Sequence, residues 1–567
     1  MSRFSCPSIL KRTVTALLVS GMAIAAVGQT HTAPSAHTIG SPNTVTADPS
    51  IVRPSTQPCV VQLFSNVLFA DFSPKTFQYN PPADCPGPWA KVVFEGDFSI
   101  TAGRQFDRTA NIWIGGANVY FGTTPEPQAT VARSWHVESD LTDYTPLFTV
   151  AQSGEAVLGN LVNSTFTSII TGSASVQFYP LARHQHAPRS ADVVLPLSAG
   201  PLGGTVALNT SADRLARTFA LPSNIEEAFL DVVAQSQSND EFWYTCVPND
   251  VANELQSCGS TAFREVEVTI DGQPAGVAPV YPWIYTGGID PFLWRPIPGV
   301  ETLNFTPYRV DLTPFAGVLS DGNQHQVALQ VFNADSNFAT TASLLLYLDE
   351  EASHVTGAVT ENTISAQPNP AVKENVSTAS DGTITGTVSV TSNRKFETAG
   401  FVKTSHGNVS TEVSQSVNFS NSQNFNITNT VYVQDITQKT TIDSVTTKRG
   451  GGPPVENFVH SEYPLLLNFS FTSNPDGTFA QTTNINQQLT RQQLDSVAGS
   501  PVHFSSLLQT DTPNDTLLFN ASFSVIGTQD QNSIERYFLR DSNGICYDRQ
   551  ISAANGVLTS ASDGSCR

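Results

Sequence analysis

Short apolar runs, many of them alternating with polar residues and each closed by a turn, repeat along most of this chain. Clear examples are Val60–Phe64, Lys91–Glu95 and Leu465–Phe471. Successive side chains of a strand point to opposite faces, so a two-residue period indicates strands with one buried face. Turn residues recur about every 8–15 residues, and no long amphipathic helix interrupts the pattern. The sequence therefore predicts an all-β fold built from β-sandwiches.

The chain has 567 residues, which is too long for one hydrophobic core and suggests about three β-rich domains. A first block of strands begins at Cys59, and a second begins near Ala191. Within the second block, Ile225–Val233 could also form a short helix, but its neighbours favour a strand. Residues 353–380 are polar and contain proline, which indicates a linker. A separate C-terminal β domain follows.

The first 28 residues have the pattern of a secretory signal peptide. Basic residues at the start precede a mostly apolar run, Val14–Val27, and small residues follow where a peptidase cleaves. A membrane anchor is the alternative, but about 14 apolar residues are too few to span a bilayer. We therefore expect a secreted protein, periplasmic or extracellular, with no membrane partner. Residues 29–57, rich in Thr, Pro, Ser and Ala, are expected to form a disordered leader.

Charged residues make up only 14% of the chain, and acidic residues outnumber basic ones. Residues 1–28 contain three basic residues and no acidic one, so the remainder carries 25 basic and 49 acidic residues, a net charge of −24. Such a surface repels phosphate backbones and anionic lipids. We therefore expect no nucleic-acid partner.

Six of the seven cysteines lie beyond the signal segment and fall into three couples that are close in sequence. Proximity predicts the disulfides Cys59–Cys85, Cys246–Cys258 and Cys546–Cys566, although six cysteines allow many other pairings. A zinc site is the alternative, but no Cys-x-x-Cys spacing supports it. Paired cysteines agree with export to an oxidising compartment.

Common catalytic motifs are absent from the sequence. It contains no Gly-x-Ser-x-Gly elbow, His-Glu-x-x-His helix, phosphate-binding loop or dinucleotide fingerprint. His184 and His186 could supply half of a metal site, but the residues around them favour a solvated loop. We expect no metal and no cofactor. Carboxylates, arginines and aromatic residues remain as the candidates for chemistry.

One segment places an acid and a base side by side at the entrance of a strand. Asp107 and Arg108 precede an apolar alternation that begins at Ile112, and a second segment sets Glu241 before the aromatic run Phe242–Tyr244. Asp107 could deprotonate a water molecule, while Glu241 could donate a proton or hold the substrate. Such chemistry needs two carboxyl groups in unequal environments. The alternative for an adjacent acid and base is a surface ion pair of little energetic value.

Aromatic residues near these segments could stack on sugar rings, and two arginines could hydrogen-bond a carbonyl oxygen. The aromatic candidates are Trp243, Tyr244, Trp283, Tyr285 and Trp294, and the arginines are Arg108 and Arg295. The alternative is that the tryptophans fill the core of the sandwiches and the arginines cap strand ends.

Several separated motifs lie between residues 60 and 350. They are Phe94–Gly96, Gln105–Arg108, Trp113–Gly116, Thr123–Pro127, Asp240–Tyr244, Phe263–Gly272, Tyr285–Pro296 and Leu312–Gly317. In content and order these motifs resemble the peptide N-glycosidase A family, in particular its acid-active bacterial type. Members of that family are amidases that release intact N-glycans from asparagine.

That family more distantly resembles the bacterial peptide N-glycosidase F enzymes, which have two adjacent eight-stranded jelly rolls. The resemblance implies a first jelly roll at residues 58–185, a second at residues 186–352, and an additional β-rich domain of unknown role at residues 381–567. The catalytic aspartate of those enzymes lies in a Trp-Asp-Arg-Tyr-Ala-Asn-Val strand. Residues Phe106–Ile112 are similar to it, so the resemblance gives Asp107 that role.

The essential glutamate of those enzymes precedes a Trp-Cys pair on the second roll. Glu241, before Phe242 and Trp243, is the best counterpart, and Glu265 is a rival because an inserted loop interrupts the register. Arg295 looks similar to their substrate-binding arginine. Their third acidic residue has no clean match, although Asn163 falls near it.

The resemblance implies an amidase that cleaves the β-aspartylglucosaminyl bond of N-glycosylated peptides and proteins, converts Asn to Asp and needs no cofactor. An acidic optimum is expected, because a pair that needs one protonated carboxyl gains occupancy as the pH falls. The alternatives are a glycan-binding, lectin-like protein and a glycoside hydrolase that uses the same carboxylates.

Overall fold

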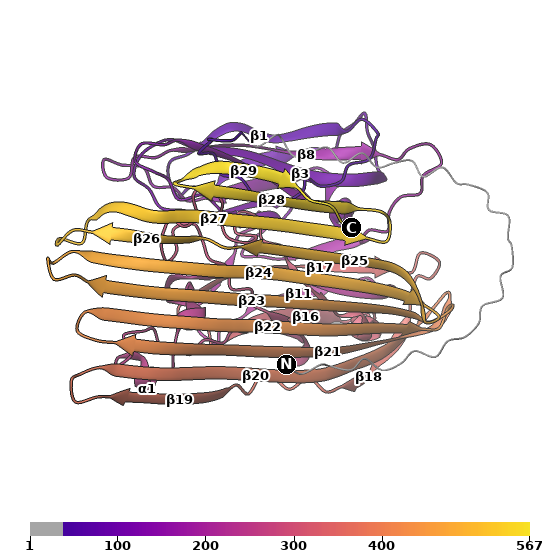
Figure 1. Cartoon of the computed structure of the whole chain (residues 1–567). Coiled ribbons are helices and arrows are strands. Elements are labelled where there is room, and N and C mark those ends of the chain that lie inside the picture. The colour runs from indigo at the N-terminus through magenta and orange to yellow at the C-terminus, as the bar shows by residue number, and fades with distance from the viewer. Residues whose placement is uncertain (1–37, 567) are drawn as a thin grey trace, which may run out of the picture.

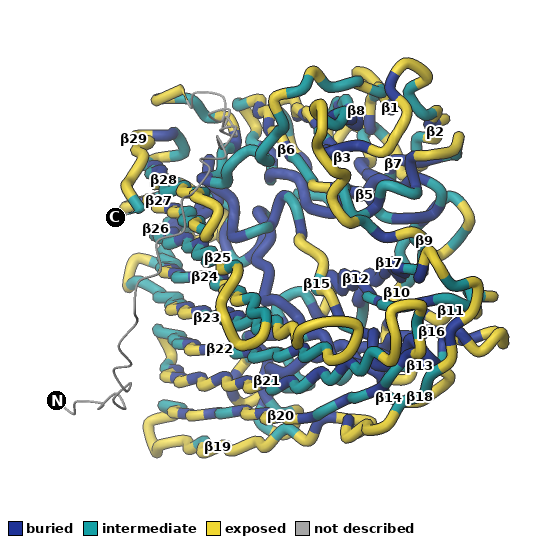
Figure 2. Tube along the Cα trace, turned by 90° about the vertical axis from the view of Figure 1, so that its right-hand side faces the viewer, coloured by how far each residue is buried: buried dark blue, intermediate teal, exposed yellow. Residues whose placement is uncertain are grey.

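The computed structural model describes residues 38–566 and shows an all-β protein. Two β-sandwiches lie one above the other, and a wide sheet of long strands covers one side of both (Figures 1 and 2). The predicted signal peptide, residues 1–28, lies outside the described residues. None of the helices in the described part of the chain is long and apolar enough to cross a membrane.

The first sandwich has jelly-roll topology. Its two sheets have the strand orders β1-β8-β3-β6 and β2-β7-β4-β5, so each sheet pairs strands that are far apart in sequence. A 3₁₀ helix, η1 (Thr142–Phe148), follows β6. The strands are β1 (Cys59–Phe69), β2 (Lys75–Tyr79), β3 (Trp89–Ile100), β4 (Thr109–Ile114), β5 (Ala117–Thr123), β6 (Arg133–Asp140), β7 (Gln152–Leu158) and β8 (Ile170–Pro180).

The second sandwich repeats this topology. Its sheets have the orders β10-β17-β12-β15, with β9 also paired to β17, and β11-β16-β13-β14. When β9 and β10 are counted as one broken strand, the order matches that of the first roll. The strands are β9 (Val193–Leu197), β10 (Val206–Leu208), β11 (Leu215–Ala220), β12 (Ile225–Gln237), β13 (Glu265–Ile270), β14 (Gln273–Pro279), β15 (Tyr308–Asp311), β16 (Gln324–Phe332) and β17 (Asn337–Leu348).

Short helices occupy the loops of the second roll. They are η2 (Ser238–Asp240), η3 (Trp243–Thr245), α1 (Asn249–Ala252), η4 (Thr313–Phe315) and α2 (Ala316–Leu319). The ambiguous segment Ile225–Val233 lies within strand β12, as its strand-like neighbours indicated. β12 runs through the middle of its sheet, between β17 and β15.

A single antiparallel sheet of 12 strands makes up the C-terminal part. Its middle strands are 19–21 residues long. The strands are β18 (Thr356–Asn362), β19 (Ala371–Thr378), β20 (Ile384–Thr404), β21 (Gly407–Ile427), β22 (Val431–Arg449), β23 (Val455–Ser473), β24 (Phe479–Val497), β25 (Ser500–Asp511), β26 (Asn514–Phe519), β27 (Val525–Asp541), β28 (Cys546–Ala554) and β29 (Val557–Asp563).

Two segments differ from the sequence-based expectation. Residues 353–380, expected to be a linker, contain β18 and β19, which both pair with β20, and the prolines that indicated a linker lie between these two strands. Residues 38–57, expected to be disordered, pack on the rest of the chain. Ala47 is fully buried, and Arg53 forms ion pairs with Glu95 and Glu138 at 2.5 and 2.8 Å. Composition alone does not reveal such distant partners.

The inner face of the large sheet is continuous with the core of the second roll. Every second residue along much of β21 is buried, as strand geometry requires. Phe419 on this face contacts Trp243 and Phe263 of the second roll, with ring centroids 6.2 and 5.0 Å apart. Burial of such aromatic surface stabilises the contact between the sheet and the roll.

Residues 38–566 contain three disulfides, which are the pairs expected from proximity in sequence. Cys59–Cys85 ties β1 to the loop before β3, Cys246–Cys258 closes the loop after η3, and Cys546–Cys566 joins β28 to the C-terminal end. Each bond closes a loop of moderate length, which stabilises the fold by roughly 3 kcal/mol in the chain-entropy model.

Candidate active site

A cleft of about 470 Å³ opens where the two jelly rolls meet. The first roll contributes residues at the start of β4, and the second contributes the end of β12 and the loop after it. Thr109 of β4 accepts hydrogen bonds from the side-chain amides of Gln235 and Gln237 of β12, both at 3.0 Å. Asp107 and Glu241, far apart in sequence, both line this cleft.

Asp107 lies just before β4 and is half-buried. Its Oδ2 accepts a hydrogen bond from the backbone N–H of Gly287 at 2.9 Å, so the second roll holds a side chain of the first. A Cβ atom at position 287 would lie 2.6 Å from Asp107 Oδ1. Only glycine therefore allows this close approach without displacing the carboxylate. Burial raises the pKa of Asp107, and the Gly287 hydrogen bond and the nearby Arg108 charge oppose that rise.

Glu126 is a third carboxyl group at this site, and the sequence did not assign it a role. It lies in the loop after β5, within the motif Thr123–Pro127, and its Oε2 accepts a hydrogen bond from the backbone N–H of Asp107. Its own N–H donates to Thr286 Oγ1 at 2.6 Å. Burial, reinforced by the Asp107 charge, raises its pKa to about 8. The one sequence signal was a lone carboxylate between two prolines in a chain with few charged residues.

Glu241 is presented by a tightly anchored turn. Asp240, next to it, is 0% exposed and forms an ion pair with Arg264 at 2.8 Å. The other oxygen of Asp240 accepts hydrogen bonds from three successive backbone N–H groups, those of residues 335–337. Asp240 therefore fixes the turn, and Glu241 is left to face the cleft. Burial and the charge of Asp107 raise the pKa of Glu241 to about 7.

The two predicted arginines take different positions. Arg108 lines the cleft, and its guanidinium donates to Gln105 Oε1. Its Nε atom is buried and has no hydrogen-bond partner within the described residues. Arg295 is not part of the cleft lining. It is 8% exposed, stacks on Phe292 at 4.2 Å from the ring centroid, and acts electrostatically on Glu126. Arg108 is therefore the cation that can contact a bound substrate directly.

Four aromatic residues predicted to stack on sugars do not reach the cleft. Trp243 and Tyr244 are 0% exposed, Trp294 is 1% exposed and Trp283 is 5% exposed. The tryptophans pack in the core: Trp283 contacts Phe305 at a centroid distance of 4.3 Å, and Trp294 Nε1 donates to Gly288 O at 3.0 Å. The stacking prediction is wrong for these residues, because the same aromatic motif serves equally well as core. Tyr285 does line the cleft, where its hydroxyl donates to Ser236 O at 2.7 Å.

Glu265, the rival to Glu241, and Asn163, which falls near the third acidic position, do not line the cleft. Glu265, in β13, is 1% exposed and hydrogen-bonds Arg394 of the large sheet. Its pKa is raised to about 7 by burial, but it does not line the cleft. Asn163 is an exposed turn residue whose side chain accepts hydrogen bonds from Thr165 N and Phe166 N at 2.8 and 2.9 Å. The geometry therefore groups Glu241, and not Glu265, with Asp107.

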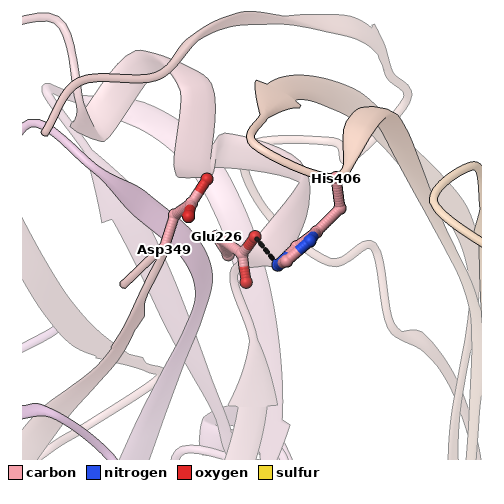
Figure 3. Close-up of side chains that lie close together, drawn as sticks. All are labelled: Glu226, Asp349 and His406. Atoms are coloured by element: carbon pink, nitrogen blue, oxygen red, sulfur yellow. Dashed lines mark ion pairs between the residues drawn. The ribbon is translucent and has the colours of Figure 1, made fainter. Parts of the chain in front are cut away.

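The histidines considered as metal ligands, His184 and His186, are exposed in the loop between β8 and β9. Among the described residues, another group, Glu226, Asp349 and His406, has ligand atoms within 4.8 Å of one another (Figure 3). Asp349 is already saturated: backbone and side-chain donors of Ser405 lie 2.6 and 2.7 Å from it. This group ties the β20–β21 turn to the second roll, and none of its members lines the cleft.

Comparison with known proteins shows the family. The family model described as "Peptide N-acetyl-beta-D-glucosaminyl asparaginase amidase A" matches residues 49–365. The chain belongs to this amidase A family. A relative from Prunus dulcis named "Peptide-N4-(N-acetyl-beta-glucosaminyl)asparagine amidase A" is 30% identical over 530 residues, which cover 89% of each chain. The similarity to this amidase A relative therefore extends past the family model into the C-terminal sheet.

Solved structures show a more distant likeness. One is PNGF-II, with 11% identity, a TM-score of 0.36, and coverage of 51% of this chain and 65% of that one. Another is PNGase F, described as a glycosylasparaginase from Flavobacterium meningosepticum, with 13% identity, a TM-score of 0.34, and coverage of 52% and 96%.

Proposed function

We propose that this amidase A family member is a secreted enzyme that hydrolyses the β-aspartylglucosaminyl amide bond of N-glycosylated peptides and proteins. The product would be an intact glycan, and the substrate asparagine would become aspartate. The observation that carries the proposal is the cleft between the rolls, where Asp107 and Glu241 face the same space, both with pKa values raised by burial, that of Glu241 to about 7.

Asp107 acts as the base in this mechanism. It removes a proton from a water molecule, whose oxygen attacks the side-chain carbonyl carbon of the substrate asparagine. The hydrogen bond from Gly287 N–H fixes the carboxylate, and partial burial makes it a stronger base than a solvated aspartate. Arg108 offsets the negative charge that develops on the carbonyl oxygen, as preorganised donors do in acyl transfer.

Glu241 acts as the proton donor. When the carbon–nitrogen bond breaks, the departing glycosylamine nitrogen needs a proton, which a carboxyl group with a pKa of about 7 holds at neutral and acidic pH. Glu126 accepts a hydrogen bond from Asp107 N–H and thereby positions the base. Asp107 thus acts in its ionised form, and Glu241 acts in its protonated form.

The enzyme would be secreted and would work at acidic pH. Three disulfides and the N-terminal pattern of residues 1–28 support secretion. An acidic working range follows from the proton on Glu241, because deprotonation above pH about 7 removes the donor.

Mass spectrometry of one N-glycopeptide before and after incubation tests the function. The expected products are a free, complete glycan and a peptide with aspartate at the former glycosylation site. Cleavage between sugars, with asparagine still glycosylated, would indicate a glycoside hydrolase. An unchanged glycopeptide that nevertheless binds the protein would indicate a lectin, and either result overturns the proposal.

A further inference from the structure

We propose that the 12-stranded C-terminal sheet positions the catalytic cleft. Buried side-chain amides on its inner face hold two segments of the second roll, residues 238–246 and 282–300. The first segment carries Glu241, and the second carries Gly287 and Arg295. This inference rests on the function proposed for the cleft and assigns a role to the C-terminal domain, which sequence patterns alone left without one.

The first segment is held through three successive backbone carbonyls, those of Tyr244–Cys246. They accept hydrogen bonds, in chain order, from the side-chain amides of Asn421, Gln434 and Gln423. Each bond is 2.9 Å long. All three carbonyls follow Glu241 within one short loop, so the sheet fixes the end of the turn opposite the Asp240 anchor.

The three amides also bind one another. Gln423 Nε2 donates to Asn421 Oδ1 at 3.0 Å, and Gln434 Nε2 donates to Gln423 Oε1 at 2.8 Å. Asn421 and Gln423 are 1% and 0% exposed. An amide buried in this way costs free energy unless its donors and acceptor are satisfied, so the network has one favourable geometry. The position of each amide is thereby fixed before it contacts the loop.

The second segment is held at both ends and near its middle. Gln487 donates to Pro282 O at 2.8 Å and accepts from Val300 N at 3.0 Å, which closes the base of the segment. Gln531 donates to the carbonyls of Phe292 and Arg295 at 3.1 and 3.0 Å. Gly287, whose N–H holds Asp107, lies between these two clamps.

The location of the amides favours positioning over adhesion alone. Neighbouring inward residues of β21, such as Phe419 and Phe425, are apolar and buried, and apolar side chains are sufficient to hold a sheet against a roll. Asn421 and Gln423 interrupt this apolar face where the loop carrying Glu241 crosses it. A side-chain amide fixes a carbonyl in direction and distance, which apolar packing does not.

The test compares Gln423→Leu and Gln531→Leu with a matched control, Gln415→Leu. Gln415 lies on the same strand as Gln423, is also buried, and donates to the Tyr308 hydroxyl at 2.9 Å, away from both segments. We expect kcat for glycan release to fall by about 10- to 100-fold in the first two variants, because small displacements of catalytic groups have effects of this size. The control should keep kcat within about twofold of wild type while losing similar thermal stability.

The pH–rate profile of glycan release is a second measurement. If the amides only stabilised the fold, their replacement would not change the shape of this profile. The rate of glycan release should fall at alkaline pH as Glu241 loses its proton. In Gln423→Leu the pH of this fall should change, because the turn that carries Glu241 shifts relative to Asp107. Equal losses of kcat in all three variants, with the pH of this fall unchanged, would overturn the inference. If Gln423→Leu does not fold, Gln434→Met takes its place, since Gln434 is less deeply buried and contacts the same loop.

Failure of the proposed function can be told apart from failure of this inference. If the wild type releases no glycan, the proposed function fails, and amide hydrogen exchange then tests the positioning directly. Residues 238–246 should exchange faster in Gln423→Leu than in Gln415→Leu. Equal exchange in both variants would contradict the role of the sheet.

Discussion

Two groups of carboxyl side chains with raised pKa values invite comparison, one at the cleft and one on the inner face of the C-terminal sheet. At the cleft, burial raises the pKa of Glu241, which lines it, to about 7, and that of Glu126, which accepts a hydrogen bond from Asp107 N–H, to about 8. Beneath the sheet, burial raises the pKa of Asp511 to about 8 and that of Glu535 well above its ordinary value. The direction and the main cause are therefore the same in both places.

The surroundings of the two groups differ. Asp511 and Glu535 are 0% and 1% exposed, lie directly opposite each other on β25 and β27, and form no salt bridge within residues 38–566. Their oxygens accept hydrogen bonds from Ser533, Gln509 and the backbone of Ala47. Asp107 and Glu241 instead line an open cleft together with Arg108. A raised pKa therefore indicates a reactive site only where a cavity and a cation accompany it.

Replacement of the base should give the largest loss of activity. Asp107→Asn keeps an oxygen for Gly287 N–H but cannot take a proton, so release should fall by about 10³-fold or more. The melting temperature should stay near that of wild type. Release of glycan from an N-glycopeptide, followed by chromatography, measures the effect. Release at a near wild-type rate would show that the site is wrongly assigned.

The contact between the two rolls should be the next most sensitive point. In Gly287→Ala the new methyl group would lie 2.6 Å from Asp107 Oδ1 and 3.2 Å from Glu126 Oε2, so both carboxyl groups must move. We expect kcat/KM to fall by about 100-fold. Gly452→Ala is the control, since nothing lies within 4 Å of a Cβ atom there. Similar kinetics for the two variants would contradict the close approach.

Substitutions at Glu126 distinguish whether its side chain acts through its charge or through its hydrogen bond to Asp107 N–H. Because its pKa is raised to about 8, Glu126 is mostly protonated below neutrality, and glutamine is then a neutral substitute of the same shape. Glu126→Gln should keep most of the activity below pH 7, whereas Glu126→Ala should lose about tenfold through the lost acceptor for Asp107 N–H. Assays at pH 5 and pH 6 distinguish the two variants, and an equal loss in both would show that the charged form is required.

The buried acids of the C-terminal sheet, Asp511 and Glu535, should affect the pH dependence of stability and leave catalysis unchanged. The pKa of Asp511 is about 8 in the folded state but near 4 in an unfolded chain, so between these values only the unfolded state ionises. The free energy of unfolding should therefore fall as the pH rises through this window, by up to about 1.4 kcal/mol per pH unit for each such acid.

Asp511→Asn removes the contribution of one acid, so its melting temperature should depend less steeply on pH between 4 and 8 than that of wild type. Its rate of glycan release at pH 5 should match wild type. Asp381→Asn, in the exposed turn between β19 and β20, is the control and should keep the wild-type slope. An unchanged slope in Asp511→Asn would show that this acid is ionised in the folded protein.

Strand alternation in the sequence was enough to predict the all-β class, and the family resemblance implied the two jelly rolls; the structure confirms both. Residue types suggested the pairing of Asp107 with Glu241, the resemblance supplied their roles, and both side chains line one cleft. Their roles stay a prediction, which the experiments above address. Asp107 lies just before β4, and Glu241 follows β12 and the short helix η2.

Other features of the site depend on contacts between distant segments, which a single sequence does not display. Glu126 gains its role only because its loop meets Thr286 and Gly287 of the other roll. Trp243 and Tyr244 look the same in sequence whether they face a sugar or a core, and here the large sheet covers them. The amides of β21 were likewise indistinguishable from the many Asn and Gln residues of the C-terminal part.

The pH–rate profile of glycan release, measured for wild type and for Glu241→Gln, tests the central claim most directly. The claim is that Asp107 works ionised while Glu241 works protonated across the same cleft. For wild type the rate should fall as the pH rises through about 7, the pKa of Glu241. In Glu241→Gln the rate should be lower throughout and this limb should disappear. A limb near pH 7 that persists unchanged in Glu241→Gln would contradict the claim.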